Sequence, residues 1–588
     1  MKLPALKRIS TSRSMVDVFK GYNHNLRIGE GEFYDMTNLT SDDYPVLSPR
    51  RKRGVYTTNS DGTTPTSPTA MIAKDSLCYV DGSKFIINGD EIDMGLSNDP
   101  KTLISMGAYV IIMPDKKYIN TANLADNGPI EATVEASAAV YFELCKIDGS
   151  EYVDMAVGDT APESPENLDV WLDTSSIPNV LKQYSSITSQ WTSIATTYIK
   201  ISSPGIGKPF AEGDGVTISG IRVKELLDLN STMVIYARGD GYIVVKGIID
   251  NTHVQTLVNG VPPITVKREM PKMDYIIESG NRLWGCRYGE ALNGQVVNEI
   301  YASKLGDFKN WNAFASISTD SYVATVGSDG PFTGAITHLG YPLFFKENCM
   351  HKVYGNYPAN YQVQTIACRG VQQDCAKSLA IVNETLFYKS RASVCAYDGS
   401  LPVEISNALG EVSYSDAVAG VLGNKYYISM KDETGGYHLF VYDTKKGMWH
   451  REDDTQATEF CNCRGELYYI DYADKQIKTV RGTGMTDTSA VHWEAVTGIL
   501  GTDSPDKKYI SRMDVRLSLN IGTKVSIYIE YDSSGAWEHI LTMDGVSLRT
   551  FPVSVRPKRC DHLRLKIAGF GDVKIFSICK TIAQGSDI

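Results

Sequence analysis

Two segments of similar pattern follow each other between Leu339 and Ser406. The first reads GYPLFFKENCMHKVYG, and the second, after a polar spacer, reads SLAIVNETLFYKSRASVCAYDGSLPVEIS. Each contains an apolar strand, a charged turn and a second strand that leads into an aromatic residue and a glycine. Leu343 in the first segment corresponds to Leu386 in the second, 43 residues later. A unit this short cannot bury both faces of its hairpin alone, so the repeat predicts a stacked or radial β architecture.

The same hairpin rhythm occurs elsewhere in the chain. Hairpin patterns lie at 76–92 and 108–121 and return at 282–290, 425–450 and 466–480. The first apolar residues of the last four units are spaced by 43, 40 and 41 residues, which is typical of propeller blades. The sequence therefore predicts an all-β protein with a β-propeller of six or seven blades. The residues expected to be buried between blades are Leu343, Phe344, Leu386, Phe387 and Leu467.

The composition and periodicity of the sequence change in two regions outside these hairpins. Residues 130–270 are rich in Ser and Thr and break the rhythm, which indicates a β-rich domain inserted into the propeller. Near the end, segments such as Met513–Leu519 alternate strictly between apolar and polar residues, which predicts a C-terminal β-sandwich. The expected division is an extended N-terminal arm (1–55), first blades (56–129), inserted domain (130–270), remaining blades (271–488) and C-terminal sandwich (489–588).

The N-terminal arm contains short apolar islands separated by Gly, Asp and Pro. Such a segment cannot fold alone, so it is expected to lie, unpaired, on the propeller or on another protein. Its candidate contact residues are Phe19, Phe33, Tyr34 and Leu47. Deleting residues 1–50 is expected to block assembly while leaving a folded core.

Three clusters of residues stand out: a basic run at the end of the arm, an acidic run and a group of aromatic residues. Arg50, Arg51, Lys52 and Arg53 are candidates for contact with phosphate or with a protein interface, or else form a solvated turn. The acidic run 452–454 is expected to be solvated or to cap a turn. In the inserted domain, Trp171, Tyr184 and Trp191 anchor short strands and are candidates for contact with a glycan.

Sequence motifs for catalysis or metal binding are absent. The chain has no P-loop, Rossmann glycine fingerprint, H-E-x-x-H, G-x-S-x-G or EF-hand loop. Its 11 cysteines form no C-x-x-C pair, and Cys461 and Cys463 have no further ligands at zinc spacing. His351 is expected to be hydrogen-bonded within the fold. We therefore expect no catalytic residue, no metal, no cofactor and reduced, buried thiols.

Charge and hydropathy limit the partners. The formal net charge is −11, which argues against a DNA-binding regulator because phosphate contacts require basic residues. It does not argue against a conduit through which DNA slides, since an acidic lumen would not retain phosphates. The apolar runs are only as long as single strands and far too short to cross a bilayer, so membrane insertion is not expected.

Three blocks resemble a known family. They are the segment from GYPLFFKEN to LPVEIS, the arm pattern F-x-G-Y-N…R-I-x-x-G-E-F-x-D-M-x-N-L-T-S-D-x-Y-P-x-L-S-P-R-x-K-R-G, and the closing RPKRCDHLRLKIAGFGDVKIFSI. Together they cover about half of the chain. They resemble the stabilization proteins of tailed bacteriophages, which are similar to the tail nozzle or tail-hub proteins of short-tailed phages.

The resemblance implies a structural virion protein of a phage tail, assembled in the host cytoplasm. It implies a ring of identical subunits, with six as the expected number, below the portal and adaptor. Such a ring would retain packaged DNA and form its exit channel, with genomic DNA passing through without sequence-specific binding. The insertion at 130–270 departs from the smaller tail hubs, so the family implies no role for it.

Two hypotheses remain open on the sequence. One is the structural nozzle, which predicts a ring with an open axial channel. The other is a receptor-binding or glycan-contacting tail protein that uses the inserted domain, whose tryptophan hairpins resemble small modules of tail fibres and tail spikes. The second hypothesis predicts an exposed aromatic and acidic groove around Trp171, Tyr184 and Trp191.

Overall fold

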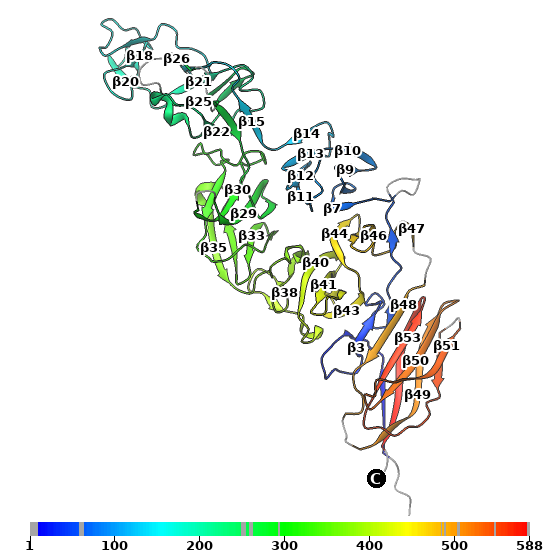
Figure 1. Ribbon diagram of the computed structural model, residues 1–588. Helices are drawn as coiled ribbons and strands as arrows, with labels where there is room; N and C mark the ends of the chain where they lie inside the picture. Colours follow the sequence, from blue (N-terminus) through cyan, green and yellow to red (C-terminus); the bar gives the residue numbers. More distant parts are fainter. Residues whose placement is uncertain are drawn as a thin grey trace, which may run out of the picture. The chain divides into compact units, whose positions relative to one another are not determined.

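The computed structural model describes residues 10–57, 64–248, 254–257, 263–291, 294–483, 485–486, 490–502, 506–545 and 548–584 (Figure 1). These residues form an all-β protein: a β-propeller with an inserted β-rich domain and a C-terminal β-sandwich, as predicted. Its few helical turns are of the 3-10 type: η1 (Lys224–Leu229), η2 (Pro358–Asn360), η3 (Ala376–Ser378) and η4 (Asn407–Leu409). None of the helices in the described part is long and apolar enough to span a membrane.

The chain divides into two compact units. The first comprises Met1–Lys101, Phe345–Met350 and Ile366–Ile588, and the second comprises Thr102–Phe344 and His351–Thr365. The first unit contains the arm, several blades and the C-terminal sandwich. The second contains further blades and the inserted domain.

Seven small sets of antiparallel strands form the blades within the described residues. Four of them are β7 (Pro68–Ala73), β8 (Leu77–Asp81), β9 (Lys84–Ile87) and β10 (Asp90–Asp93); β11 (Thr102–Met106), β12 (Tyr109–Met113), β13 (Lys117–Asn120) and β14 (Asn127–Pro129); β28 (Tyr275–Ser279), β29 (Arg282–Glu290), β30 (Val296–Ala302) and β31 (Tyr322–Thr325); and β32 (Gly334–His338), β33 (Tyr341–Lys346), β34 (Cys349–Tyr354) and β35 (Gln362–Ala367).

The other three blades lie in the later part of the chain. They are β36 (Ala380–Val382), β37 (Thr385–Lys389), β38 (Val394–Tyr397) and β39 (Val403–Glu404); β40 (Tyr414–Leu422), β41 (Lys425–Asp432), β42 (Tyr437–Asp443) and β43 (Met448–Asp453); and β44 (Ala457–Cys463), β45 (Glu466–Asp471) and β46 (Ile477–Thr479). The last blade obtains its fourth strand from the arm, because β6 (Gly54–Val55) pairs with β46 and with β47 (Met485–Thr486).

Neighbouring blades pack through apolar clusters. In the second unit, Phe344 of β33 lies in a cluster with Trp284 and Ile300 of β29 and β30. In the first unit, Leu467 of β45 packs with Tyr427 and Val441 of the preceding blade. The residues predicted to be buried are buried, with exposed fractions of 0–3%: Leu343, Phe344, Leu386, Phe387 and Leu467. The repeat therefore identified buried strands of the blades.

The arm is paired within its own chain, contrary to the expectation of an unpaired segment. Its strands are β1 (Thr11–Val16), β2 (Gly21–Tyr22), β3 (Glu32–Thr37), β4 (Leu39–Thr40), β5 (Ser48–Pro49) and β6. β2 and β3 join blade β40–β43 to C-terminal strands in one ten-stranded sheet, and β1 pairs with β54. A side chain at Gly21 would overlap the carbonyl oxygen of Trp449, so the close approach of β2 to β43 requires glycine there.

Two sheets form the C-terminal sandwich. Its strands are β48 (His492–Thr497), β49 (Lys508–Leu519), β50 (Lys524–Tyr531), β51 (Trp537–Asp544), β52 (Arg549–Val553), β53 (Leu563–Phe570) and β54 (Val573–Gln584). One sheet has the order β1-β54-β49-β52, and the other part runs β3-β48-β53-β50-β51. Alternate residues of β49, such as Met513, Val515 and Leu517, are buried, as the strict alternation predicted. Figure 1 shows β3, in blue, beside the orange and red strands of this domain.

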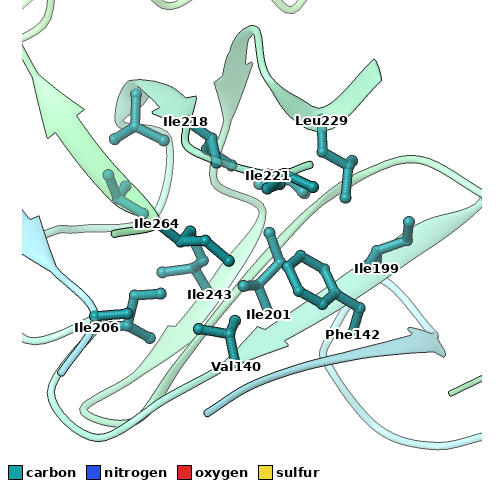
Figure 2. Close-up of a cluster of buried hydrophobic side chains, with 14 of the residues drawn as sticks. Val140, Phe142, Ile199, Ile201, Ile206, Ile218, Ile221, Leu229, Ile243 and Ile264 are labelled. Atoms are coloured by element: carbon teal, nitrogen blue, oxygen red, sulfur yellow. The ribbon is translucent and has the colours of Figure 1, made fainter. Parts of the chain in front are cut away.

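The inserted domain begins at β15 and ends at β27, which pair with each other. Its strands are β15 (Ala132–Glu135), β16 (Val140–Cys145), β17 (Ala156–Gly158), β18 (Val170–Asp173), β19 (Val180–Ser185), β20 (Gln190–Ser193), β21 (Tyr198–Ser202), β22 (Gly215–Ser219), β23 (Thr232–Val234), β24 (Ala237–Gly239), β25 (Tyr242–Lys246), β26 (Val254–Leu257) and β27 (Thr265–Arg268). Figure 2 shows its core, where Phe142, Ile201 and Ile243 lie together with other aliphatic side chains. The domain therefore buries an apolar core of its own.

Candidate functional site

The three aromatic residues singled out in the inserted domain lie together on the sheet β17-β18-β19-β20. Tyr184 and Trp191 are direct cross-strand partners with ring centroids 5.4 Å apart. The ring of Trp171 lies 5.5 Å from that of Trp191 in an edge-to-face arrangement. Trp171 is buried and its Nε1 donates a hydrogen bond to the carbonyl oxygen of Gly158 at 3.0 Å, whereas Tyr184 and Trp191 are partly exposed. The cluster therefore has a buried anchor and two rings that solvent reaches.

Charged groups surround the buried ring of this cluster. Lys182 Nζ lies 4.9 Å from the centre of the Trp171 ring and donates to Asp173 at 2.7 Å. This hydrogen bond, together with hydrogen bonds from Ser175, lowers the pKa of Asp173 to about 2. Asp173 is thus ionised and already engaged, and Lys182 makes a cation–π contact with Trp171.

The basic run of the arm lies against blade β40–β43 in the first unit. Arg53 Nη2 is 2.5 Å from Glu452 and 3.3 Å from Asp453, and Arg50 Nη2 is 3.0 Å from Asp453. Arg51 and Lys52 line a hollow beside them, and the Arg51 side chain is exposed. Arg50 and Arg53 therefore contact a neighbouring element of the same chain, while their contact with phosphate or with another protein stays a prediction.

The acidic run at the end of β43 differs in part from its expectation. Glu452 has an exposed fraction of only 2%, and Asp453 is also largely shielded, because both serve as partners of the arm arginines. Only Asp454, which pairs with Arg451, is mostly exposed. The expectation of a solvated or capping run is confirmed for Asp454, which is exposed, and for Asp453, whose Oδ1 accepts a hydrogen bond from the backbone N–H of Thr455. It is wrong for Glu452, whose partner lies in the arm, near the other end of the sequence. The opposite charges of the RRKR run (50–53) and the EDD run (452–454) could have suggested that they pair, but nothing in the sequence indicated that these distant segments lie together.

The four apolar arm residues have different environments. Phe19, Phe33 and Leu47 are buried in the chain itself, with Phe19 and Phe33 stacked at 6.0 Å. Tyr34 is partly exposed and stacks on His24 at 4.2 Å. Their contacts within the first unit supply the partners that the sequence could not identify. A role for them in contact with another subunit or an adaptor stays a prediction.

The chemical groups elsewhere in the described part form no reactive constellation. Both ring nitrogens of buried His351 are hydrogen-bonded to hydroxyls, at 2.8 Å to Ser328 and 3.0 Å to Thr365. The cysteines are free thiols, and burial raises the pKa of Cys78 to about 12 and of Cys368 to about 11. Such thiols are poor nucleophiles and metal ligands near neutral pH. Among the described residues, no group of three or more His, Cys, Asp or Glu side chains is arranged to hold a metal ion.

Comparison with known proteins gives no relative. No protein-family model and no curated protein matches the sequence. Among solved structures, the chain is similar to an exo-β-1,3-galactanase from Phanerochaete chrysosporium (7% identity, 52% of this chain and 94% of that one, TM-score 0.21). It is also similar to a mutant Trypanosoma rangeli sialidase with trans-sialidase activity (9% identity, 97% and 96%, TM-score 0.20). Superpositions this poor carry no argument about function.

Proposed function

We propose that this chain is a non-catalytic structural protein of a bacteriophage tail that assembles with copies of itself into a ring. In this proposal the ring lies below the portal and adaptor, retains the packaged genome and forms the channel through which the genome leaves. The support comes from sequence blocks that resemble phage stabilization proteins. One observation in the structure strengthens that support: the arm and the closing block, which carry two of these matches, contact each other.

The contacts between these blocks are specific. Leu47 forms a backbone bridge with Ile575, and Lys574 Nζ lies 2.7 Å from Asp43. β1, which precedes the matched part of the arm, pairs along its length with β54, and its last pair joins Val16 to Ile578 at the end of the closing block. Matches in segments from opposite ends of the sequence thus concern one folded body.

The test of this proposal is electron microscopy of the purified chain. We expect two-dimensional class averages that show a closed ring with an axial opening, and immunogold labelling at the tail of phage particles that carry this protein. Particles that remain monomeric at high concentration, together with virions that lack the chain, would contradict the proposal. The structural role also predicts that no glycan is cleaved when the chain is incubated with polysaccharides.

A second candidate function rests on the aromatic cluster of the inserted domain. Partly exposed aromatic rings can stack on the apolar face of a sugar ring, and Trp191 and Tyr184 lie side by side on one sheet. In this proposal the inserted domain contacts a surface glycan of the host. The sheet supplies rigid positions for both rings because they are direct cross-strand partners.

Glycan-array binding by the full chain tests this second function. We expect binding that Trp191→Ala abolishes and that the control Tyr141→Ala retains, since Tyr141 is an exposed aromatic residue on β16 of the same domain. No binding to any glycan, or equal loss in both variants, would exclude a glycan site at this cluster.

A further inference from the structure

A polar cavity of about 430 Å³ lies where the arm meets the blades β40–β43 and β44–β46. We call it the arm cavity. Its charged lining consists of seven cations and three carboxylates: Arg50, Arg51, Arg53, Lys425, Lys445, Lys446 and Arg481, with Asp42, Asp443 and Glu452. Seven positive and three negative side chains leave an excess of four positive charges. This excess occurs in a chain whose formal net charge is −11.

Part of the positive charge is already neutralised. Lys425 Nζ is 2.6 Å from Asp42, Lys446 Nζ is 3.2 Å from Asp443, and Arg53 is paired with Glu452. These pairs hold the wall of the cavity in place. They also account for all three carboxylates that line it.

Three of the remaining cations have no carboxylate partner. Arg51, Lys445 and Arg481 are exposed and form no ion pair in the part of the chain that the structure describes. Arg481 donates one hydrogen bond from its guanidinium, to the carbonyl oxygen of Gly465 at 3.2 Å. Three cations drawn from the arm and from two blades therefore line a common hollow without an anion paired to them.

Arg53 also lines the arm cavity, with a guanidinium that is already paired with Glu452 and Asp453. Its Nε and Nη1 atoms are buried and have no hydrogen-bond partner among the described residues, so they are shielded from a ligand in the cavity. Burial and the adjacent Arg53 also lower the pKa of Arg50, which indicates crowded positive charge.

We propose that the arm cavity binds phosphate groups. A phosphate presents several acceptor oxygens and a charge near −2, which suits guanidinium forks and lysine ammonium groups placed around it. A second hollow of about 490 Å³ shares Asp42, Arg50 and Arg51 with the cavity. It adds Lys52 and Lys574 together with the carboxylates of Asp43 and Asp572, and Lys574 is paired with Asp43. The two hollows together have room for more than one phosphate group. The inference does not depend on ring formation.

Linked phosphates can come from a free oligophosphate or from a nucleic acid strand, and calorimetric titration can separate these sources. The full chain is titrated at low salt with inorganic tripolyphosphate and, separately, with a short DNA duplex. We expect saturable binding of tripolyphosphate with one site per chain. Binding of DNA with the same dependence on the variants below would identify a nucleic acid backbone as the source of the phosphates.

The decisive comparison uses variants of exposed residues that line the cavity. Arg51 and Lys445 form no ion pair in the described part of the chain, so their replacement should leave the folded structure intact. Arg51→Ala/Lys445→Ala is expected to weaken binding about tenfold or more, because each variant removes a charged donor from the phosphate oxygens. The control Lys20→Ala/Lys524→Ala makes the same change in net charge at two exposed lysines that do not line the cavity, and should bind as the unmodified chain does.

Three results would overturn the inference. They are the absence of binding to both probes at low salt, unchanged affinity in Arg51→Ala/Lys445→Ala, and an equal loss of affinity in the control pair. Circular dichroism and thermal unfolding of each variant verify that the fold is intact.

Discussion

Two regions of the molecule, the arm junction and the inserted domain, are each stabilised by a different kind of interaction. The arm junction consists of residues 10–55, strands β40–β43 and the C-terminal sandwich. Strand pairs and ion pairs between chain segments distant in the sequence hold it, and Lys580 Nζ also donates to Ser14 Oγ at 2.8 Å. The inserted domain instead packs Ile, Val, Leu and Phe side chains from its own strands (Figure 2).

This difference has consequences for folding. Closing contacts between the two ends of the chain costs loop entropy before any contact is gained, so the arm junction should form late and slowly. The apolar core of the inserted domain is built from its own residues, and its ends are adjacent because Ala132 pairs with Arg268. Its buried polar contacts outside the domain include those with Asn310, which hydrogen-bonds to Asp214 and Gly215. It should fold, and be removable, as a unit.

The largest expected effect comes from deleting the arm. Removal of residues 10–50 takes away β1 to β5 and leaves Asp453 without Arg50, while exposing the strands that β2 and β3 joined. We expect the first unit to fail to fold, whereas the sequence alone predicted a folded core after deletion of residues 1–50. The measurement is limited proteolysis with circular dichroism of the purified product.

Excision of the inserted domain is the matched comparison. Replacing residues 132–268 by a short Gly/Ser linker should leave the blades and the C-terminal sandwich folded, since the two ends are neighbours. If this excision unfolds the chain as completely as loss of the arm, the two regions do not differ as proposed.

The second largest effect is expected in the core of the inserted domain. Phe142 is fully buried, and Phe142→Ala should cost about 3–5 kcal/mol through lost burial and a residual cavity. The loss should appear as early proteolytic cleavage inside residues 132–268, with the thermal transition of the first unit unchanged. A uniform downward shift of every transition would show that the domain does not unfold separately.

The third effect concerns the buried ion pair of the arm junction. Arg53→Ala leaves Glu452 buried without its cation and should destabilise the first unit by about 3 kcal/mol. The double variant Arg53→Met/Glu452→Gln should recover much of this loss, because it leaves no uncompensated charge at Glu452. Chemical denaturation of Arg53→Met, Glu452→Gln and the double variant measures the coupling, and additive losses would contradict it.

The same contrast explains what the sequence could predict. Local periodicity was sufficient for the blades, because Leu343, Leu386 and Leu467 mark buried strands within units of about 40 residues. It also placed Tyr184 and Trp191 on one hairpin, but the exposed groove expected around Trp171 is not found, because that ring is buried. It could not place the arm, whose partners at Trp449 and Ile575 lie near the opposite end of the sequence.

The arm cavity was only partly foreseen for this reason. The run Arg50–Arg53 stood out as a local cluster of charge. Lys425, Lys445 and Arg481 did not, because nothing local to them indicates a common site. Only the pairing of the arm with two blades brings them to one place.

A smaller effect is expected from pH. His450 in β43 is buried beside Lys425 and Lys446, with Asp443 and Asp42 also near, and burial is the main reason that its pKa falls to about 3. Since this folded-state pKa lies below the unfolded value near 6.5, the unfolded chain binds the proton first as pH falls. The stability from neutral His450 is complete above about pH 6.5 and is lost progressively toward pH 3.

This titration can be measured as a difference between two conditions. Going from about pH 7.5 to about pH 5.5 should lower the unfolding free energy of the first unit by roughly 1.4 kcal/mol through His450 alone. His450→Phe should remove that part of the pH dependence, with His492→Phe at an exposed position as the control. An unchanged pH dependence in His450→Phe would mean that this histidine is not buried in neutral form.

The smallest effect on stability is expected at Trp191. Its ring is partly exposed and contacts Trp171 and Tyr184 at 5.5 and 5.4 Å, so Trp191→Ala should cost only about 1 kcal/mol, the scale of one aromatic pair. Trp171→Ala should cost more, because that ring is buried and its Nε1 hydrogen bond to Gly158 is lost as well. Thermal unfolding of the inserted domain gives the order. A larger loss at Trp191 would make it a core residue and leave only Tyr184 free to stack on a sugar.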